Sequence, residues 1–298
     1  MFDGFQLDRV DLGEVTLRFR HGGAGTPVVL LHGHPRTHTT WHAVAPRLAE
    51  RHLVVTPDLR GYGQSTLPPD APDHAQSSKR AMARDVAQLM AHLGHDRFAV
   101  AGHDRGALVA FRTAMDHPEA VSHLVVMDGL PVIEHLERTD AVFARAWWHW
   151  WFLGQTDKPA ERVICPDPDG WYRTPGPDAM GADNHADVWA ALRDPAVVHG
   201  MCEDYRAGLG IDRDHDEADR AAGRQIVCPT LLLESADDDL DIQGDPAAIW
   251  APWLAKPISH QVIDSGHHQA EEAPGPVADA ILDFLSGVPK VGSAGVLG

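Results

Sequence analysis

The sequence predicts an α/β protein in which a mostly parallel, doubly wound sheet carries a helical cap inserted after a strand that ends at Asp128. Two observations predict this class. Short apolar runs alternate with helical patterns over residues 26–128, and such alternation is typical of a parallel sheet covered by helices on both faces. This alternation of strand and helix patterns stops between residues 129 and 224 and resumes after Cys228, which indicates an insertion.

The first part of the chain supplies four predicted strands. They are the apolar runs of "TPVVLLHGHP", "LVVTPDLRGYGQS", "RFAVAGH" and "SHLVVMD". Apolar residues at helical spacing predict helices over residues 39–50 and 77–93, and a third from Ala107 onward. Strands and helices therefore alternate as a parallel sheet requires.

The insertion contains helix-like runs, the aromatic cluster "WWHWWF" and a loop rich in proline and glycine. Strand patterns return over residues 228–239 and 258–268, and a last helix is predicted over residues 276–285. We expect residues 1–129 and 226–287 to form the core and residues 130–225 the cap. Residues 288–298 are rich in small side chains and are expected to be a disordered tail.

Composition limits the classes of molecule that the chain is expected to bind. The chain has 298 residues and a formal net charge of −18, which opposes binding to nucleic acid or anionic membranes. Three widely spaced cysteines and an N-terminus without a basic, apolar leader favour the cytoplasm. The 20 histidines show no metal-ligand spacing. We expect no cofactor and no metal, a small-molecule substrate as the partner, and a homodimer as one conceivable assembly.

The segment Gly102-x-Asp104-x-Gly106 has the pattern of a nucleophile elbow with aspartate in the serine position. Glycines on both sides would let a strand and a helix approach closely around a strained residue. The alternative is a plain turn in which Asp104 caps the following helix. Open α/β sheets place their sites at the carboxyl ends of the strands, where this segment falls.

Two further groups fall at strand ends. His267 follows the last predicted strand, where a general base would stand, although His268 beside it leaves the choice open. An acid to orient the imidazole could be Asp128, or one of the three aspartates of the run Asp237, Asp238 and Asp239. The coincidence of nucleophile, base and acid is a stronger argument than any one of them.

The chain resembles the aspartate-nucleophile branch of the α/β-hydrolase superfamily, which holds dehalogenases and soluble epoxide hydrolases. "HGHPRT", "DLRGYGQS", "GHDRGA" and "GHHQAEEAP" match that branch in order and spacing. Within it the chain is most similar to fluoroacetate (haloacetate) dehalogenases, through "MDGLPV", "WHWWF" and "MCEDYRAG".

The resemblance implies a role for each matching residue. Asp104 would be the nucleophile, His267 the base and Asp128 the acid. Backbone N–H groups of His34 and Arg105 would stabilise an oxyanion. His149, Trp150 and Tyr205 would bind the leaving halide, and Arg105 would hold the substrate carboxylate.

One position departs from the family. Fluoroacetate dehalogenases have a second arginine where this chain has Leu108, so half of the carboxylate clamp is missing. Arg36, together with His34, is a candidate to replace the lost charge. We predict a hydrolytic dehalogenase acting on a small haloacetate-type 2-haloacid. The alternatives are an epoxide hydrolase or other hydrolase, which would need Tyr172 to reach inward as half of a phenol pair, and a non-catalytic binding protein.

Overall fold

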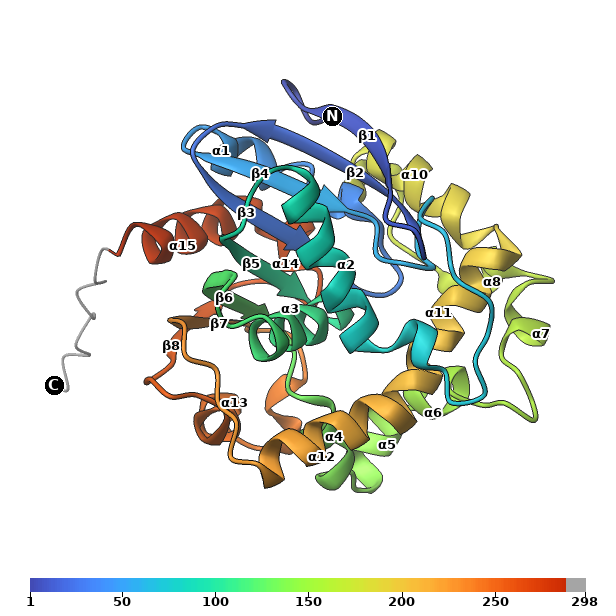
Figure 1. The fold of residues 1–298 in the computed structure, drawn as a ribbon. Helices are drawn as coiled ribbons and strands as arrows, with labels where there is room; N and C mark the ends of the chain where they lie inside the picture. Colours follow the sequence, from blue (N-terminus) through green and yellow to red (C-terminus); the bar gives the residue numbers. More distant parts are fainter. Residues whose placement is uncertain (288–298) are drawn as a thin grey trace, which may run out of the picture.

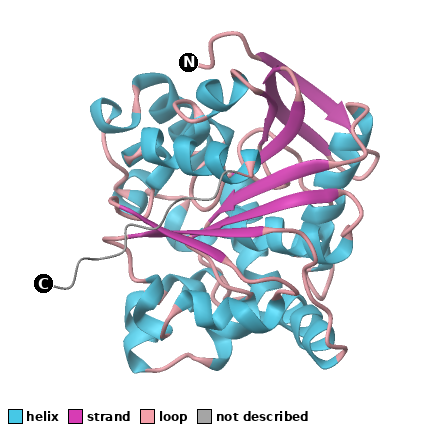
Figure 2. Cartoon of the chain, turned by 90° about the vertical axis from the view of Figure 1, so that its left-hand side faces the viewer, coloured by secondary structure: helices cyan, strands magenta, loops and turns pink. Residues whose placement is uncertain are grey.

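Eight strands form one twisted sheet between layers of helices in the computed structural model, which describes residues 1–287 (Figures 1 and 2). The strand order is β1-β2-β4-β3-β5-β6-β7-β8. The pairs from β4 to β8 are parallel, whereas β1 pairs with β2, and β2 with β4, in antiparallel fashion. The predicted mostly parallel sheet is therefore confirmed, and the predicted tail, residues 288–298, lies outside the described residues. The strands are β1 (Gln6–Asp11), β2 (Thr16–Gly23), β3 (Thr26–Leu31), β4 (His52–Pro57), β5 (Phe98–His103), β6 (Val121–Met127), β7 (Thr230–Ser235) and β8 (Ser259–Ile263).

The two antiparallel strands at the edge were not predicted. The strand β1 is exposed at five of its six residues, so it has no apolar run that would mark it. In β2 the buried Arg18 interrupts the apolar pattern, and its charge is paired with Asp58 and Asp187. Val10 of β1 and Leu17 and Phe19 of β2 are buried in the core, but neither strand contains a continuous apolar run that would reveal it in the sequence.

Alternate residues of the central strands divide between two buried clusters. In β3, Val29 and Leu31 pack in one cluster, while Val28 and Leu30 pack in the other. The first cluster includes apolar residues of α2 (Lys79–His92) and α3 (Arg105–Asp116), and the second those of α1 (Ala45–Ala49) and α15 (Pro274–Ser286). The central strands are thus covered on both faces, as the doubly wound prediction requires.

The predicted helix over residues 39–50 is two short helices in the structure. A 3₁₀ helix, η1, covers His38–Trp41, and α1 begins at Ala45. Pro46 lies in the first turn of α1, and proline has no N–H to continue a preceding helix. The helices predicted over residues 77–93 and 276–285 are confirmed as α2 and α15.

Only helices and connecting segments lie between β6 and β7, a stretch that the structure describes in full. They occupy the right and lower parts of Figure 1. No helix among residues 1–287 is long and apolar enough to cross a membrane. The inserted helices are α4 (Val132–Glu137), α5 (Ala141–Ala146), α6 (His149–Leu153), α7 (Glu161–Ile164), α8 (Pro168–Tyr172), α9 (Pro177–Met180), α10 (Ala182–Leu192), α11 (Pro195–Ala207), η3 (Gly208–Asp212) and α12 (Arg213–Ala221).

Candidate active site

Asp104 is the single residue between β5 and α3, and its backbone has φ 52° and ψ −120°. Residues other than glycine adopt a positive φ only at a cost in strain. The turn requires glycine at positions 102 and 106, because neighbouring backbone atoms leave no room for a side chain there. A Cβ on Gly102 would lie 2.0 Å from the carbonyl oxygen of Gly106, and a Cβ on Gly106 would lie 2.4 Å from that of Leu31. The Asp104 side chain makes no hydrogen bond that caps α3, so the alternative of a plain capped turn is not what the structure shows.

The Asp104 carboxylate is held by two backbone N–H groups. That of His34 donates to Oδ1 at 2.6 Å, and that of Arg105 donates to the same carboxylate. Burial raises the pKa of Asp104, but the positive charge of His267 and the backbone N–H of Arg105 are among the causes that outweigh it and lower the pKa below its usual value. The aspartate is therefore ionised at neutral pH. These are the two N–H groups that the family resemblance proposed for an oxyanion.

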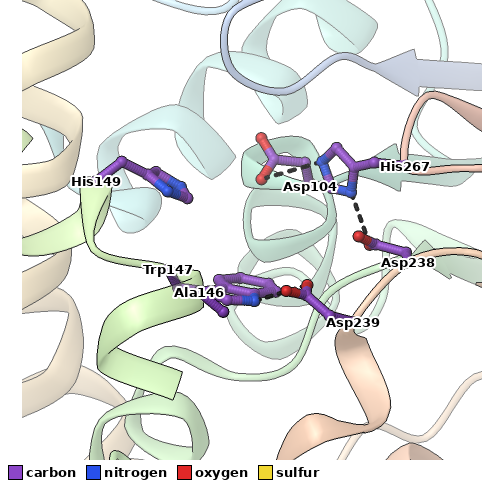
Figure 3. A pocket seen from close by; sticks show the side chains of 7 residues that line it. All are labelled: Asp104, Ala146, Trp147, His149, Asp238, Asp239 and His267. Carbon is purple, nitrogen blue, oxygen red and sulfur yellow. Dashed lines mark hydrogen bonds and ion pairs between the residues drawn. The ribbon is translucent and has the colours of Figure 1, made fainter. Parts of the chain in front are cut away.

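His267 lies between two carboxylates (Figure 3). Its Nε2 is 3.9 Å from Oδ2 of Asp104, and its Nδ1 is 2.8 Å from Oδ2 of Asp238. Burial lowers the pKa of His267, but Asp238 and Asp104 raise it more, to about 9. His268 makes no ion pair with Asp104, and burial holds the pKa of His268 well below the usual value. Distance therefore favours His267 over His268 as the base.

The acid that contacts the base differs from the one expected. Asp128 accepts hydrogen bonds from the backbone N–H of Ser235 at 2.8 Å, from its hydroxyl at 2.5 Å and from Nε2 of Gln269 at 2.7 Å. These three donors, and not His267, make the hydrogen bonds to the carboxyl of Asp128, although one of its oxygens lies within 4.8 Å of a ring nitrogen of His267. Asp238, on the loop after β7, instead makes the hydrogen bond to His267. Burial raises the pKa of Asp128 to about 6.

The neighbouring aspartates have other contacts. The backbone N–H of Asp237 donates to the carbonyl oxygen of Ser265 at 3.0 Å. Oδ1 of Asp239 accepts a hydrogen bond from Nε1 of Trp147 at 2.7 Å. Of the three aspartates left open by the sequence, Asp238 is thus the one placed to orient the imidazole.

A cavity of about 120 Å³ lies in front of Asp104. Figure 3 shows the His149 ring across this space from Asp104 and His267. Pockets for drug-sized ligands are usually about 300–1,000 Å³, so this one suits a molecule of only a few heavy atoms. The lining residues are Asp104, Ala146, Trp147, His149, Asp238, Asp239 and His267.

Tyr205 is the centre of a ring cluster that contains His34 and the other two predicted halide-binding residues, His149 and Trp150. Its ring centroid lies 5.9 Å from that of His149, 6.1 Å from that of Trp150 and 5.3 Å from that of His34. Burial raises the pKa of Tyr205 well above its usual value and lowers that of His149 to about 4. At neutral pH the phenol therefore keeps its proton and the imidazole is uncharged. The Nε1–H of Trp150 is buried and has no hydrogen-bond partner.

Arg105 is fully buried against α11. Its Nε and Nη2 each lie 3.0 Å from the carboxylate of Asp204, and its guanidinium stacks 4.2 Å from the ring centroid of Tyr205. Lys79 and the hydroxyl of Tyr62 also donate to Asp204. Only Nη1 of Arg105 is without a partner. The sequence does not predict this cluster, although Asp204 stands beside Tyr205 in "MCEDYRAG", because fully buried charges are rare and leave no pattern.

Arg36, the candidate to replace the charge that is missing at Leu108, is already paired within the protein. The guanidinium of Arg36 is bound by both carboxylate oxygens of Glu271, at 2.9 and 3.2 Å. Leu108 is buried on α3, one turn after Arg105. The structure thus places Arg36 in an internal ion pair, rather than at the substrate carboxylate where it was expected.

Two groups of side chains beside the nucleophile could hold a metal ion, because one ligand atom of each residue lies within 4.8 Å of the others; they are His103, His267 and His268, and Asp128, Asp238 and His267. In the histidine group Nε2 of His103 and Nδ1 of His268 are buried without a hydrogen-bond partner, and Nε2 of His103 lies 3.9 Å from Oδ2 of Asp128. The same histidine, His267, contacts both Asp104 and Asp238, so a metal there would compete with the base.

Comparison with known proteins places the chain in one family. The family of the alpha/beta hydrolase fold matches residues 26–274. A fluoroacetate dehalogenase of Burkholderia sp. is 41% identical over 96% of this chain and 95% of its own. A soluble epoxide hydrolase of Corynebacterium sp. is 30% identical over 89% and 91%.

A solved structure agrees with these relatives. ALR0039 of Nostoc sp. PCC 7120, assigned to the alpha/beta hydrolases, superposes with a TM-score of 0.92 at 39% identity. The match covers 96% of this chain and 99% of that one. The protein therefore belongs to the α/β hydrolase fold family and is similar in sequence to a fluoroacetate dehalogenase.

Proposed function

We propose that the protein is a hydrolytic dehalogenase that acts on small 2-haloacids of the haloacetate type. The observation that carries the proposal is the buried, unpartnered Nε1–H of Trp150 in the ring cluster around Tyr205. A buried donor without a partner is costly in a folded protein unless a ligand satisfies it. A departing halide needs donors and no acceptors, and indole nitrogen can only donate.

The first step is attack by Asp104 on the carbon that bears the halogen. An ionised carboxylate needs no deprotonation, and the low pKa of Asp104 keeps it ionised. A C–O bond forms between Asp104 and the substrate carbon, while the C–X bond breaks and its electron pair leaves with the halide. Trp150, the phenol of Tyr205 and the neutral ring of His149 would donate to that halide.

The second step is hydrolysis of the ester. The negative charge of Asp104 is one cause of the raised pKa of His267. Esterification removes this charge, so the imidazolium can lose its proton to solvent and become a base. Water attacks Cγ of Asp104 and its proton passes to Nε2 of His267, while Asp238 holds Nδ1.

The tetrahedral intermediate carries an oxyanion where Oδ1 of Asp104 now accepts the N–H of His34. A preorganised donor of this kind is typically worth about 3 kcal/mol of transition-state stabilisation. Collapse of the intermediate breaks the bond between Cγ and the substrate oxygen, which takes up the proton that Nε2 of His267 accepted from water. The products are a hydroxy acid, a halide ion and a regenerated carboxylate.

The size and the chemistry of the site support a small acid. The cavity volume of about 120 Å³ suits a compound as small as a haloacetate. Nη1 of Arg105 is a buried, unpartnered cationic donor that a carboxylate oxygen would satisfy. The 41% identity to a fluoroacetate dehalogenase over almost the whole chain points the same way.

Halide release tests the proposal. Purified protein is incubated with fluoroacetate, chloroacetate and 2-chloropropionate, and free halide is measured against an Asp104→Asn control. We expect release from at least one haloacid with the unchanged protein and none with the control. The proposal is wrong if no haloacid loses halide.

Epoxide hydrolysis is the second candidate. It is favoured by the protonated phenol of Tyr205 beside His149, since an opening epoxide oxygen needs a nearby acid. Against it, the hydroxyl of Tyr172 lies 3.5 Å from the sulfur of Met201, rather than being paired with Tyr205. Diol formation from a small epoxide, with no halide release from any haloacid, would favour this reading.

A further inference from the structure

The side chain of His34 takes no part in ester formation or ester hydrolysis. Its backbone N–H binds Oδ1 of Asp104 at 2.6 Å, so the residue borders the nucleophile. Its ring meets the ring of Tyr205 almost perpendicularly, at 88° with centroids 5.3 Å apart, and lies 5.9 Å from that of Tyr172. The imidazole therefore belongs to the same ring cluster as the proposed halide-binding residues.

The Nδ1 atom of His34 is buried and has no hydrogen-bond partner. Three residues that contact the Tyr205 ring share this property, the others being Arg105 through Nη1 and Trp150 through Nε1. Burial lowers the pKa of His34 to about 3, although Asp104 opposes this. The ring is thus neutral, and its Nδ1 can carry a proton to donate.

Arg105 cannot bind both oxygens of a carboxylate. Its Nε and Nη2 are taken by Asp204, and Nη2 also donates to the backbone oxygen of that residue at 2.8 Å. Only Nη1 remains. Arg36 is held by Glu271, and Leu108 has no polar atom. One oxygen of the substrate carboxylate therefore lacks a donor among these residues.

The backbone N–H groups of Arg105 and His34 both interact with the carboxylate of Asp104, so both residues border the nucleophile. We propose that Nδ1 of His34 donates a hydrogen bond to the second carboxylate oxygen of a small 2-haloacid, opposite Nη1 of Arg105. The inference rests on the proposed function. His34 then has two separable roles, since its backbone serves the nucleophile and its side chain sets substrate specificity.

The test replaces the side chain and leaves the backbone donor in place. His34→Phe keeps a ring against Tyr205 but removes both nitrogens, whereas His34→Asn keeps an amide near the position of Nδ1. His92→Phe, an exposed histidine at the end of α2, is the matched control. Calorimetry measures the binding of acetate, which contains the carboxylate but no leaving group. Steady-state halide release from chloroacetate gives KM and kcat separately.

A hydrogen bond to a charged group is worth roughly 10- to 100-fold in binding. We expect His34→Phe to weaken acetate binding and raise KM by about that factor with little change in kcat, His34→Asn to restore most of the loss, and His92→Phe to change nothing. Equal acetate affinity in all four proteins overturns the role of His34 and leaves the dehalogenase proposal intact. Absence of both acetate binding and halide release overturns the two together.

Discussion

The hydrogen bond between Asp238 and His267 leads to the sharpest prediction. The two atoms lie 2.8 Å apart, and Asp238 is the chief cause that raises the pKa of His267 from 6.5 to about 9. A rise of this size corresponds to about 3 kcal/mol in favour of the imidazolium, shared among the surrounding carboxylates. Loss of one charge-assisted hydrogen bond costs about 1.5–3 kcal/mol, so Asp238→Asn should slow ester hydrolysis roughly 10- to 100-fold.

Because ester hydrolysis in Asp238→Asn should be slower than ester formation, halide release should show a burst. Rapid-quench measurements of halide would show one fast equivalent of release per active site, followed by slow turnover. An NMR titration of His267 would show its pKa lowered toward the usual value. The unchanged protein should lose stability as the pH rises from 6.5 to about 9. A group with a raised folded pKa contributes fully below its unfolded pKa, and its contribution disappears above the folded one.

Asp128→Asn is the matched control. Asp128 is held by Ser235 and Gln269, so its replacement should change the pKa of His267 much less than Asp238→Asn does. The reasoning is refuted if Asp128→Asn lowers that pKa and produces the burst while Asp238→Asn does neither.

Three further outcomes are expected. His267→Asn should accumulate a covalent adduct, detected by mass spectrometry on the peptide that contains Asp104; sustained turnover at the unchanged rate would count against the base. Trp150→Phe should lower kcat for fluoroacetate by roughly tenfold or more, and by less for bromoacetate, because fluoride is the more strongly hydrated ion and loses a buried donor; equal kcat values before and after replacement would contradict halide binding. Gly106→Ala should lower the free energy of unfolding by at least about 1–3 kcal/mol, since its Cβ would lie 2.4 Å from a backbone oxygen; an unchanged denaturation midpoint would show that the elbow has room.

Much of the fold could be predicted because the central strands are buried on both faces. Such strands appear in the sequence as continuous apolar runs, as in "TPVVLL" of β3. The edge strand β1 could not be predicted this way, since its pairing to β2 relies on backbone hydrogen bonds and its side chains are mostly exposed. Pro46 is a sequence signal for the break after η1, whereas the helical spacing of the residues around it predicts one continuous helix.

The candidate site was predictable where a local turn fixes the residue. Asp104 stands in an elbow whose glycines are visible in the sequence, and His267 directly follows the last strand. The partner of His267 depends instead on where the carboxylates on two different loops come to lie. Ser235 and Gln269 decide this by binding Asp128, and nothing in the local sequence around Asp128 reveals these donors.

The partners of buried charges are likewise not predictable from local sequence when they are distant in the chain. Arg36 finds Glu271 and Arg105 finds Asp204, in each case across many residues of sequence. A sequence motif shows that an arginine is present near the site, but it does not show whether the guanidinium is already paired. Whether the guanidinium is already paired determines how many of its N–H donors remain for a substrate.

Nucleophilic attack by Asp104 is the central claim, and isotope labelling tests it most directly. A single turnover of chloroacetate by excess enzyme in H₂¹⁸O should place ¹⁸O in the carboxylate of Asp104, while the first glycolate released contains the unlabelled oxygen of the aspartate. Peptide and product masses report both positions. Glycolate labelled in the first turnover, with no ¹⁸O in Asp104, would show that water attacks the substrate directly and would contradict the account.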